Sequence, residues 1–151
     1  MRLNLRVVIG SDIAAHDLKE EVLNKLRVKG YDIEDTGTSG PNHGDFADAA
    51  EAACTAIQRG EYDRGILICG TGKGICMAAN KFKGIRAGLC YDTFPAVIAS
   101  LDNNTNVLCT GAWQMPSADH CVRMIEGWLL ARYTGRDVDG MERAAVIEAS
   151  R

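Results

Sequence analysis

The sequence lacks several features that would assign it to a functional class at once. Its 17 lysine and arginine residues against 20 aspartate and glutamate residues give a formal charge of −3. A charge this small does not indicate a surface for nucleic acid or for an anionic membrane. No apolar run approaches the length of a membrane span. The first residues, Met1 to Leu5, lead into a predicted strand without the architecture of a secretory signal, so we expect a cytoplasmic protein.

Cysteine and histidine are present, but not in the spacing of a disulfide framework or a metal site. The six cysteines (54, 69, 76, 90, 109 and 121) form no C-x-x-C pair and lie mostly in apolar surroundings. The three histidines (16, 43 and 120) are widely scattered, whereas a zinc site needs clustered ligands. We therefore expect free cysteines packed in the core, no bound metal and no cofactor.

Short apolar segments alternate with amphipathic ones along the whole chain. At 151 residues the chain is long enough for one domain with a sizeable core, which we take as residues 1–151. The expected strands cover 5–9, 31–35 (at or near an edge of the sheet), 66–69, part of 84–90, and 107–109. The expected helices cover about 14–29, 45–59, 75–82, 93–101 and 117–133, and the tail from 134 becomes helical. This alternation predicts an α/β fold, a Rossmann-like three-layer sandwich. Its five-stranded parallel sheet has helices on both faces and a C-terminal helical extension.

The most informative stretch is GILICGTGKG, from Gly65 to Gly74. Its apolar run predicts a strand buried on both faces, and three glycines at alternate positions then lead into a helix. Backbone N–H groups at such a turn lack internal partners and attract anions, and the same setting favours a thiolate at Cys69. A tight turn beside a small buried cysteine is an equally common outcome. The spacing matches neither G-x-G-x-x-G nor a P-loop.

Several polar residues are expected beyond the carboxyl ends of the strands, where parallel sheets bind ligands. Asp12 follows the first strand and suits either catalysis or capping of the next helix. Asp102 and Asn103 lie in a polar loop that could reach the same edge, although such loops are usually only solvated. Arg136, beside a glycine, suits an anion clamp or a solvated side chain. A thiol, the Thr71 hydroxyl, free amides and an aspartate in one cleft suit proton abstraction next to a carbonyl.

The order of these motifs resembles the superfamily of ribose-5-phosphate isomerase B and galactose-6-phosphate isomerase. The likeness covers nearly the whole chain, and ILICGTG followed by AANK and GIRA is its most specific part. Further matching segments are IGSD (9–12), DTF (92–94), Asn103 and NVL (106–108). The resemblance implies an aldose–ketose isomerase working through a cis-enediolate, with ribose 5-phosphate as the leading substrate. It also implies a homodimer or homotetramer with interfacial sites.

The resemblance also implies roles for individual residues. The catalytic residues are Cys69, which moves the proton, Thr71, which holds an enediolate oxygen, and Asp12, which assists ring opening and hydroxyl binding. The substrate-binding residues are Ser11, Gly70, Gly72, Gly74, Asp102, Asn103 and Arg136. Arg136 matches a phosphate-binding arginine that often acts across a subunit boundary, and we expect the segment 134–151 to reach a neighbouring subunit.

Three residues depart from the family pattern. Ile13 and Asp102 replace histidines, and Trp113 replaces an arginine, so contacts for phosphate and for ring opening are altered. Lys73 suits a replacement cation or a solvated side chain. Isomerisation of another sugar is therefore an alternative: a tetrose phosphate, which needs no ring opening, a hexose phosphate or an unphosphorylated sugar. A non-catalytic sugar-binding subunit is a further alternative, which the retained Cys69 and Thr71 disfavour.

Overall fold

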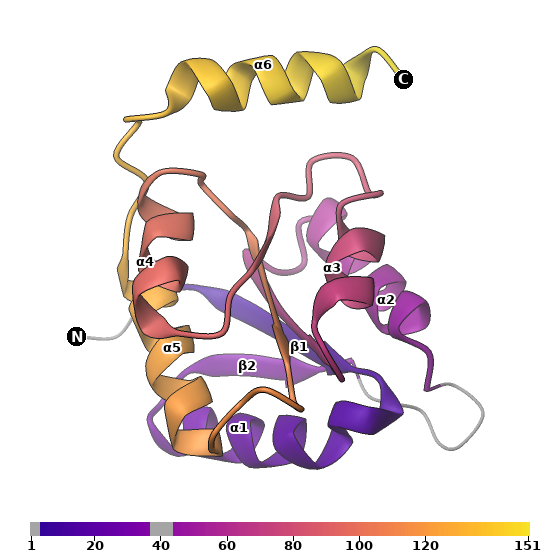
Figure 1. Ribbon diagram of the computed structural model, residues 1–151, viewed down its shortest axis with the longest axis vertical. Coiled ribbons are helices and arrows are strands. Elements are labelled where there is room, and N and C mark those ends of the chain that lie inside the picture. Colours follow the sequence, from indigo (N-terminus) through magenta and orange to yellow (C-terminus); the bar gives the residue numbers. More distant parts are fainter. Residues whose placement is uncertain (1–3, 37–43) are drawn as a thin grey trace.

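The computed structural model describes residues 4–36 and 44–151, which form a single parallel sheet covered by helices (Figure 1). The strands are β1 (Arg6–Ser11), β2 (Asp32–Asp35), β3 (Arg64–Cys69), β4 (Ala87–Leu89) and β5 (Val107–Gly111). Their order is β2-β1-β3-β5-β4, and all four pairings are parallel. The apolar strand β3 is therefore central, as expected of a strand buried on both faces. Strand β2 lies at an edge, as expected for residues 31–35.

Helices cover both faces of the sheet because the side chains of its buried strands alternate between them. The helical elements are η1 (Ile13–Ala15, a 3₁₀ turn), α1 (His16–Val28), α2 (Phe46–Gln58), α3 (Lys73–Ala79), α4 (Thr93–Leu101), α5 (Ala118–Leu130) and α6 (Val138–Ala149). Ile66 and Ile68 of β3 pack in one core cluster with α1, α4 and α5. Leu67 and Cys69 pack in a second cluster with α2 and α3. This is the three-layer sandwich that the sequence predicts.

Several element boundaries differ from the sequence-based expectation. The helix after the glycines ends at Ala79 rather than near Phe82. The side chain of Asn80 there accepts from the Ala87 N–H at 2.9 Å and donates to the Ala87 carbonyl at 3.0 Å, which joins α3 to β4. Helix α5 ends at Leu130, and β5 extends two residues further, to Gly111. Most of residues 36–44, between the expected second strand and second helix, lie outside the described residues, and so does His43.

The chain reverses its direction of travel across the sheet between β1 and β3. From β1 it moves outward to β2, and it then returns to place β3 on the other side of β1. Such a switch point opens a crevice beyond the carboxyl ends of the two strands. Asp12 follows β1 and Cys69 ends β3, so both lie at this crevice. We call this side of the sheet the carboxyl edge and the opposite side the amino edge.

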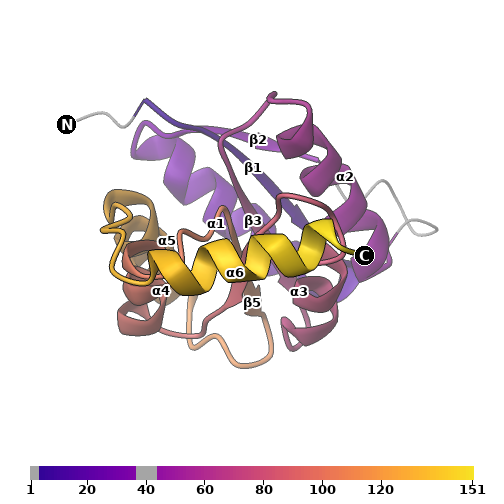
Figure 2. The same ribbon diagram turned by 90° about the horizontal axis from the view of Figure 1, so that it is seen from above.

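The last helix, α6, is set apart from the sandwich. None of its residues is buried. Figure 1 shows it (yellow) running across one end of the molecule, and Figure 2 shows it extended over that end. Its few contacts include Glu148, which accepts from the Gly84 N–H at 3.3 and 3.2 Å. The predicted helical extension is thus present, but it contributes little to the core of its own chain.

Two bulk properties bear on function. All six cysteines are free, as expected, and all except the half-buried Cys76 are buried. In the part of the chain that the structure describes, no helix has the length and apolar character needed to cross a bilayer.

Candidate active site

The glycine turn, residues 70–74, holds the thiol of Cys69 in place. Cys69 is almost fully buried, and the Gly72 N–H donates to its Sγ at 3.1 Å. Gly72 has φ +81°, and a Cβ there would lie 2.6 Å from the carbonyl carbon of Thr110. Only glycine fits this conformation and this contact, so the turn is specified by its sequence. The amide that contacts the thiol is therefore fixed by the backbone.

Hydrogen bonds from two other segments hold the glycine turn. The Tyr91 hydroxyl donates to the Thr71 carbonyl at 2.6 Å. Beyond β5, the N–H groups of Ala112 and Trp113 donate to the carbonyls of Cys69 and Gly70, each at 2.9 Å. The Thr71 hydroxyl oxygen accepts from the Lys73 N–H at 3.2 Å. Thr71 is consequently held in the turn that directly follows Cys69.

Asp12 lies at the same edge and also serves as a cap. Its N–H donates to the Ile68 carbonyl of β3 at 3.2 Å, and its carboxylate accepts from the Ala15 N–H at 3.1 Å. Burial raises the pKa of this carboxyl above its ordinary value, and the charge of Asp45 adds to the rise. Hydrogen bonds from backbone N–H groups, chiefly that of Ala15, oppose it. The capping role and the position expected of a site residue are thus both present.

Ser11 lies beside Asp12 but faces the opposite side of the sheet from Cys69. Its register partner is Ile68, whose side chain packs against α1 and α5, while Cys69 packs against α2 and α3. The Ser11 side chain is buried, and its Oγ has no hydrogen-bond partner. Any contact of Ser11 with a ligand at the thiol would therefore come from its backbone.

Three exposed apolar side chains lie at the carboxyl edge, and two of them lie against the glycine turn. Trp113, Phe46 and Ile13 are 72%, 40% and 59% exposed. A Cβ on Gly70 would lie 2.8 Å from the Trp113 ring, and one on Gly74 would lie 3.1 Å from the Phe46 ring. We call Ile13, Phe46 and Trp113 the apolar rim. Sequence reasoning missed Phe46 because it follows a loop rather than a strand; its place at the start of a helix after β2 was the available signal.

Asp102, Asn103 and Arg136 lie at the amino edge, so the expectation that Asp102 and Asn103 could reach the edge of Cys69 within one chain is wrong. The reason is topological, because α4 carries the chain back across the sheet before the loop that leads into β5. The Arg136 guanidinium donates to the carboxylate of Asp102. Asn103 Nδ2 contacts Met141 Sδ of α6 at 3.9 Å.

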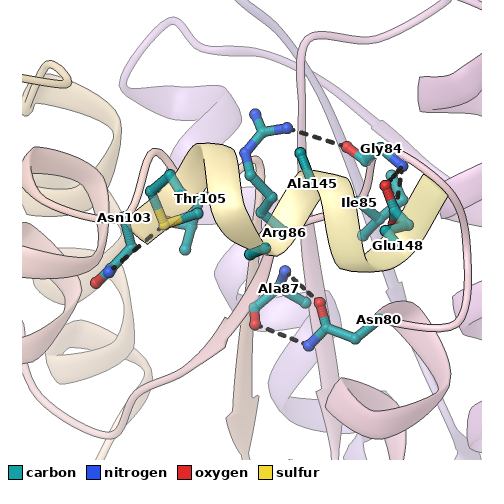
Figure 3. A pocket seen from close by; sticks show the side chains of 11 residues that line it. Asn80, Gly84, Ile85, Arg86, Ala87, Asn103, Thr105, Ala145 and Glu148 are labelled. Atoms are coloured by element: carbon teal, nitrogen blue, oxygen red, sulfur yellow. Dashed lines mark hydrogen bonds between the residues drawn. The ribbon is translucent and has the colours of Figure 1, made fainter. Parts of the chain in front are cut away.

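A cavity of about 480 Å³ opens at the amino edge, between α6 and the segment that leads into β4 (Figure 3). It is lined by Asn80, Gly84, Ile85, Arg86, Ala87, Asn103, Thr105, Met141, Ala144, Ala145 and Glu148. Arg86 donates from Nε to the Asn104 carbonyl at 2.6 Å and from a terminal nitrogen to the Gly84 carbonyl at 3.2 Å. Asn103 thus stands at an open cavity rather than at the thiol.

The candidate residues therefore form two groups at opposite ends of the strands. A strand of five or six residues at about 3.3 Å per residue separates the groups by roughly 17–20 Å. The group at the carboxyl edge joins a thiol, a hydroxyl, backbone amides and a carboxylate, which suits proton transfer next to a carbonyl. The group at the amino edge joins a guanidinium, an amide and a carboxylate. Among residues 4–36 and 44–151, no three His, Cys, Asp or Glu side chains cluster as metal ligands.

Comparison with known proteins gives consistent matches over most of the chain. The family model described as Ribose/Galactose Isomerase matches residues 7–144. The 4-deoxy-4-sulfo-D-erythrose isomerase of Clostridium sp. (strain MSTE9) is 41% identical over 86% of this chain and 82% of its own length. Ribose-5-phosphate isomerase B of Escherichia coli (strain K12) is 36% identical, over 97% and 98%. The structure of Clostridium thermocellum ribose-5-phosphate isomerase B has a TM-score of 0.91 and 35% identity, and covers 97% of this chain and 99% of that one.

Proposed function

The chain belongs to the ribose/galactose isomerase family, and we propose that it interconverts an aldose and a ketose phosphate through a cis-enediolate. The observation that carries the proposal is the buried Cys69 thiol, held by the Gly72 amide beside the Thr71 hydroxyl. Isomerisation needs one base that moves a proton between adjacent carbons and donors that stabilise the oxyanion formed between the two transfers.

Each group at the carboxyl edge has a role in this reaction. The Cys69 thiolate takes the proton from C2 of the open-chain aldose, and the electron pair of that bond forms the enediolate. The Cys69 thiol, whose proton exchanges in part with solvent, then protonates C1 while a proton passes from the C2 hydroxyl to the oxygen on C1, which gives the ketose. Thr71 and the amides of Gly70, Gly72 and Gly74 stabilise the developing oxyanion. Asp12 binds a sugar hydroxyl and assists ring opening. The reaction is redox-neutral and needs no cofactor.

The amino-edge residues are proposed to act on the site of a second copy of the chain. Arg136 carries the charge suited to a phosphate, and Asp102 and Asn103 provide oxygen and amide groups for hydroxyls. They lie about a strand length from the thiol of their own chain, and α6 has no buried residue there. A homodimer or homotetramer that joins the carboxyl edge of one copy to the amino edge of another would complete the site. In this proposal residues 1–151 form one domain, and the segment 134–151 reaches the neighbouring subunit.

Two candidate substrates follow, and the first is ribose 5-phosphate, which agrees with the names of several relatives. The second candidate is a four-carbon sugar phosphate. Relatives named D-erythrulose-4-phosphate isomerase support it, one of them from Pectobacterium atrosepticum at 38% identity. Asp102 also supports the four-carbon substrate, because it occupies the position where the family has a ring-opening histidine and is paired with Arg136 instead. A tetrose phosphate has its terminal oxygen blocked and needs no ring opening. The buried free thiols suit the reducing cytoplasm, where we propose that the protein acts.

Deuterium incorporation in heavy water tests this function. Wild-type protein is incubated with ribose 5-phosphate, erythrose 4-phosphate, a hexose 6-phosphate and free ribose, and exchange at the carbon next to the carbonyl is followed by NMR. We expect isomerisation with exchange for at least one phosphorylated sugar. The Cys69→Ala variant should lose it by about 10³-fold or more because the proton carrier is gone.

The matched control is Cys121→Ala, which removes a buried thiol from α5 on the other face of the sheet. It should retain exchange. Absence of exchange with every sugar, in wild-type protein of confirmed fold and mass, would leave the sugar-binding subunit as the better description. Exchange that persists in Cys69→Ala would exclude the cysteine mechanism.

A further inference from the structure

The indole of Trp113 is the largest exposed side chain beside the reacting thiol. We propose that Trp113 is a specificity-determining residue that closes the site beside Gly70 and favours four-carbon over five-carbon substrates. The inference rests on the proposed function, because it concerns the substrate of the same site. Its evidence is the position of the ring, the character of the apolar rim and the charges at the carboxyl edge.

The backbone around Trp113 fixes the ring relative to the thiol. The Ala112 N–H donates to the carbonyl of Cys69 itself, and the Trp113 N–H donates to the carbonyl of Gly70, both at 2.9 Å. A Cβ on Gly70 would lie 2.8–2.9 Å from three atoms of the six-membered ring. The ring therefore already occupies the space beside Gly70, directly after the catalytic cysteine. With 72% of the residue exposed, the rest of the ring remains free to contact a ligand.

The charges at the carboxyl edge do not favour binding of a substrate phosphate at this half of the site. The apolar rim offers no cation to a phosphate, and Lys73 is the one cation within the glycine turn. The carboxyl groups of Asp12 and Asp45 lie close enough for the charge of Asp45 to contribute to the raised pKa of Asp12. Apart from Lys73, apolar contact and shape are the means of selection here, and an aromatic ring packs well on the C–H face of a carbon chain.

The position of the Trp113 ring limits the length of the substrate's carbon chain. A reacting carbon must lie within about 3–3.5 Å of the base for proton transfer. With C1 and C2 held at Cys69, carbons further along the chain extend past the rim, and a ring fixed against Gly70 limits how many fit. One additional carbon in an apolar pocket changes kcat/KM by roughly 10–200-fold. A five-carbon substrate is therefore expected to lose against a four-carbon one of the same configuration.

The ratio of kcat/KM for D-erythrose 4-phosphate to that for D-ribose 5-phosphate tests the proposal. We expect wild-type protein to favour the tetrose by about tenfold or more. Trp113→Ala should lower the ratio by about tenfold, chiefly through better turnover of ribose 5-phosphate. Trp113→Phe keeps an aromatic ring and should retain much of the preference. Phe94→Ala, at another highly exposed aromatic residue, on α4, is the matched control and should leave the ratio unchanged.

The outcomes separate this proposal from the function on which it rests. Turnover of both sugars with the same ratio in wild type and in Trp113→Ala would overturn the role of Trp113 and leave the isomerase proposal standing. A wild-type preference for ribose 5-phosphate would overturn it as well. Absence of turnover with either sugar would overturn the role of Trp113, and absence of exchange with every sugar of the panel above would overturn the isomerase proposal as well.

Tryptophan fluorescence gives a second measurement that does not depend on catalysis. The chain has two tryptophans, and Trp128 is fully buried, with its indole N–H donating to Thr105 Oγ1 at 2.8 Å. Titration of Cys69→Ala with erythrose 4-phosphate should therefore change mainly the emission of Trp113. We expect a saturable change that disappears in the Cys69→Ala, Trp113→Phe double variant. An unchanged spectrum at sugar concentrations that saturate binding by calorimetry would contradict the contact.

Discussion

The two edges of the sheet differ in how their polar groups are held. At the carboxyl edge, backbone groups of β3, the glycine turn and the segment after β5 bond to one another, so Cys69 and Thr71 are fixed by main-chain geometry. At the amino edge, Asp102, Asn103 and Arg136 are held through side chains, beside an open cavity and an unburied helix. Proton transfer requires a geometry fixed to a fraction of an ångström, whereas binding of a charged group tolerates more freedom.

This difference has a consequence for assembly. On one chain, the carboxyl edge holds the rigid groups for proton transfer and the amino edge holds the open groups for binding. The first lacks a phosphate-binding arginine and the second lacks a base. Joining unlike edges of two copies supplies both, and a two-fold arrangement does so twice with one interface. Each prediction below changes one edge and compares the result with a matched change at the other.

The largest effect is expected when defects at the two edges are placed on different chains. Cys69→Ala should abolish turnover, and Arg136→Ala should cost about 2–4 kcal/mol of transition-state stabilisation for a phosphorylated sugar. Mixed dimers formed by refolding the two variants together should contain one site with both residues intact. For random pairing, activity should recover to about one quarter of wild type. Steady-state kinetics and native mass spectrometry of the same sample measure both quantities.

The control carries both defects on one chain. A Cys69→Ala, Arg136→Ala double variant mixed with Cys69→Ala contains no thiol at any site and should recover nothing. If the first mixture also stays inactive although mixed dimers are present, the two edges do not share a site.

Glycines with the same backbone conformation test how tightly each edge is packed. Gly72 (φ +81°) is at the carboxyl edge and Gly84 (φ +78°) at the amino edge. A Cβ on Gly72 would meet the Thr110 backbone at 2.6 Å, while one on Gly84 would meet nothing within 4 Å. We expect Gly84→Ala to cost roughly 1–2 kcal/mol, the cost of the left-handed conformation alone. Gly72→Ala should cost roughly 3 kcal/mol or more and distort the turn.

Urea denaturation of both glycine variants measures these costs, and exchange assays report on the turn. Equal losses of stability would mean that the backbone near Thr110 moves aside easily. In that case the rigidity assigned to the carboxyl edge would be wrong.

The carboxyl edge was largely predictable from sequence, for reasons visible in its residues. The apolar run before Gly70 identifies a central strand, and the position after a strand places Asp12 and Thr71 at one crevice without knowledge of packing. Phe46 escaped this reasoning because the loop before it hides its relation to β2. Trp113 was noted, but its contact with Gly70 depends on a distance that no pattern in the sequence encodes.

The amino edge was less predictable because its placement depends on topology. Asp102 and Asn103 precede a strand, and a polar loop carries no mark of the sheet edge on which it lies. The pair of Asp102 with Arg136 joins residues 34 positions apart through the segment that follows α5, which periodicity cannot detect. The family resemblance predicted that these residues belong to the site, while the structure places them at the edge opposite Cys69.

The smallest expected effect concerns two carboxylates, one at each edge. Burial raises the pKa of Asp12 above its ordinary value of 3.8, so the folded chain disfavours the ionised form. This cost is absent below pH 3.8 and develops as the pH rises through the folded pKa. Asp12→Asn removes it and keeps a capping side chain, so its urea midpoint relative to wild type should rise between pH 3.5 and 7. The rise should be small because the carboxylate is only partly buried.

Asp102→Asn should act in the opposite direction. It removes the partner of Arg136, whose side chain is 67% exposed, and a pair of this kind contributes at most about 1 kcal/mol. Its urea midpoint at pH 7 should therefore lie below that of wild type, whereas that of Asp12→Asn should lie above it. Midpoints measured for wild type and both variants at pH 3.5, 5 and 7 give the two signs directly. If both variants shift the midpoint at pH 7 in the same direction, desolvation at the carboxyl edge and ion pairing at the amino edge do not distinguish the two carboxylates.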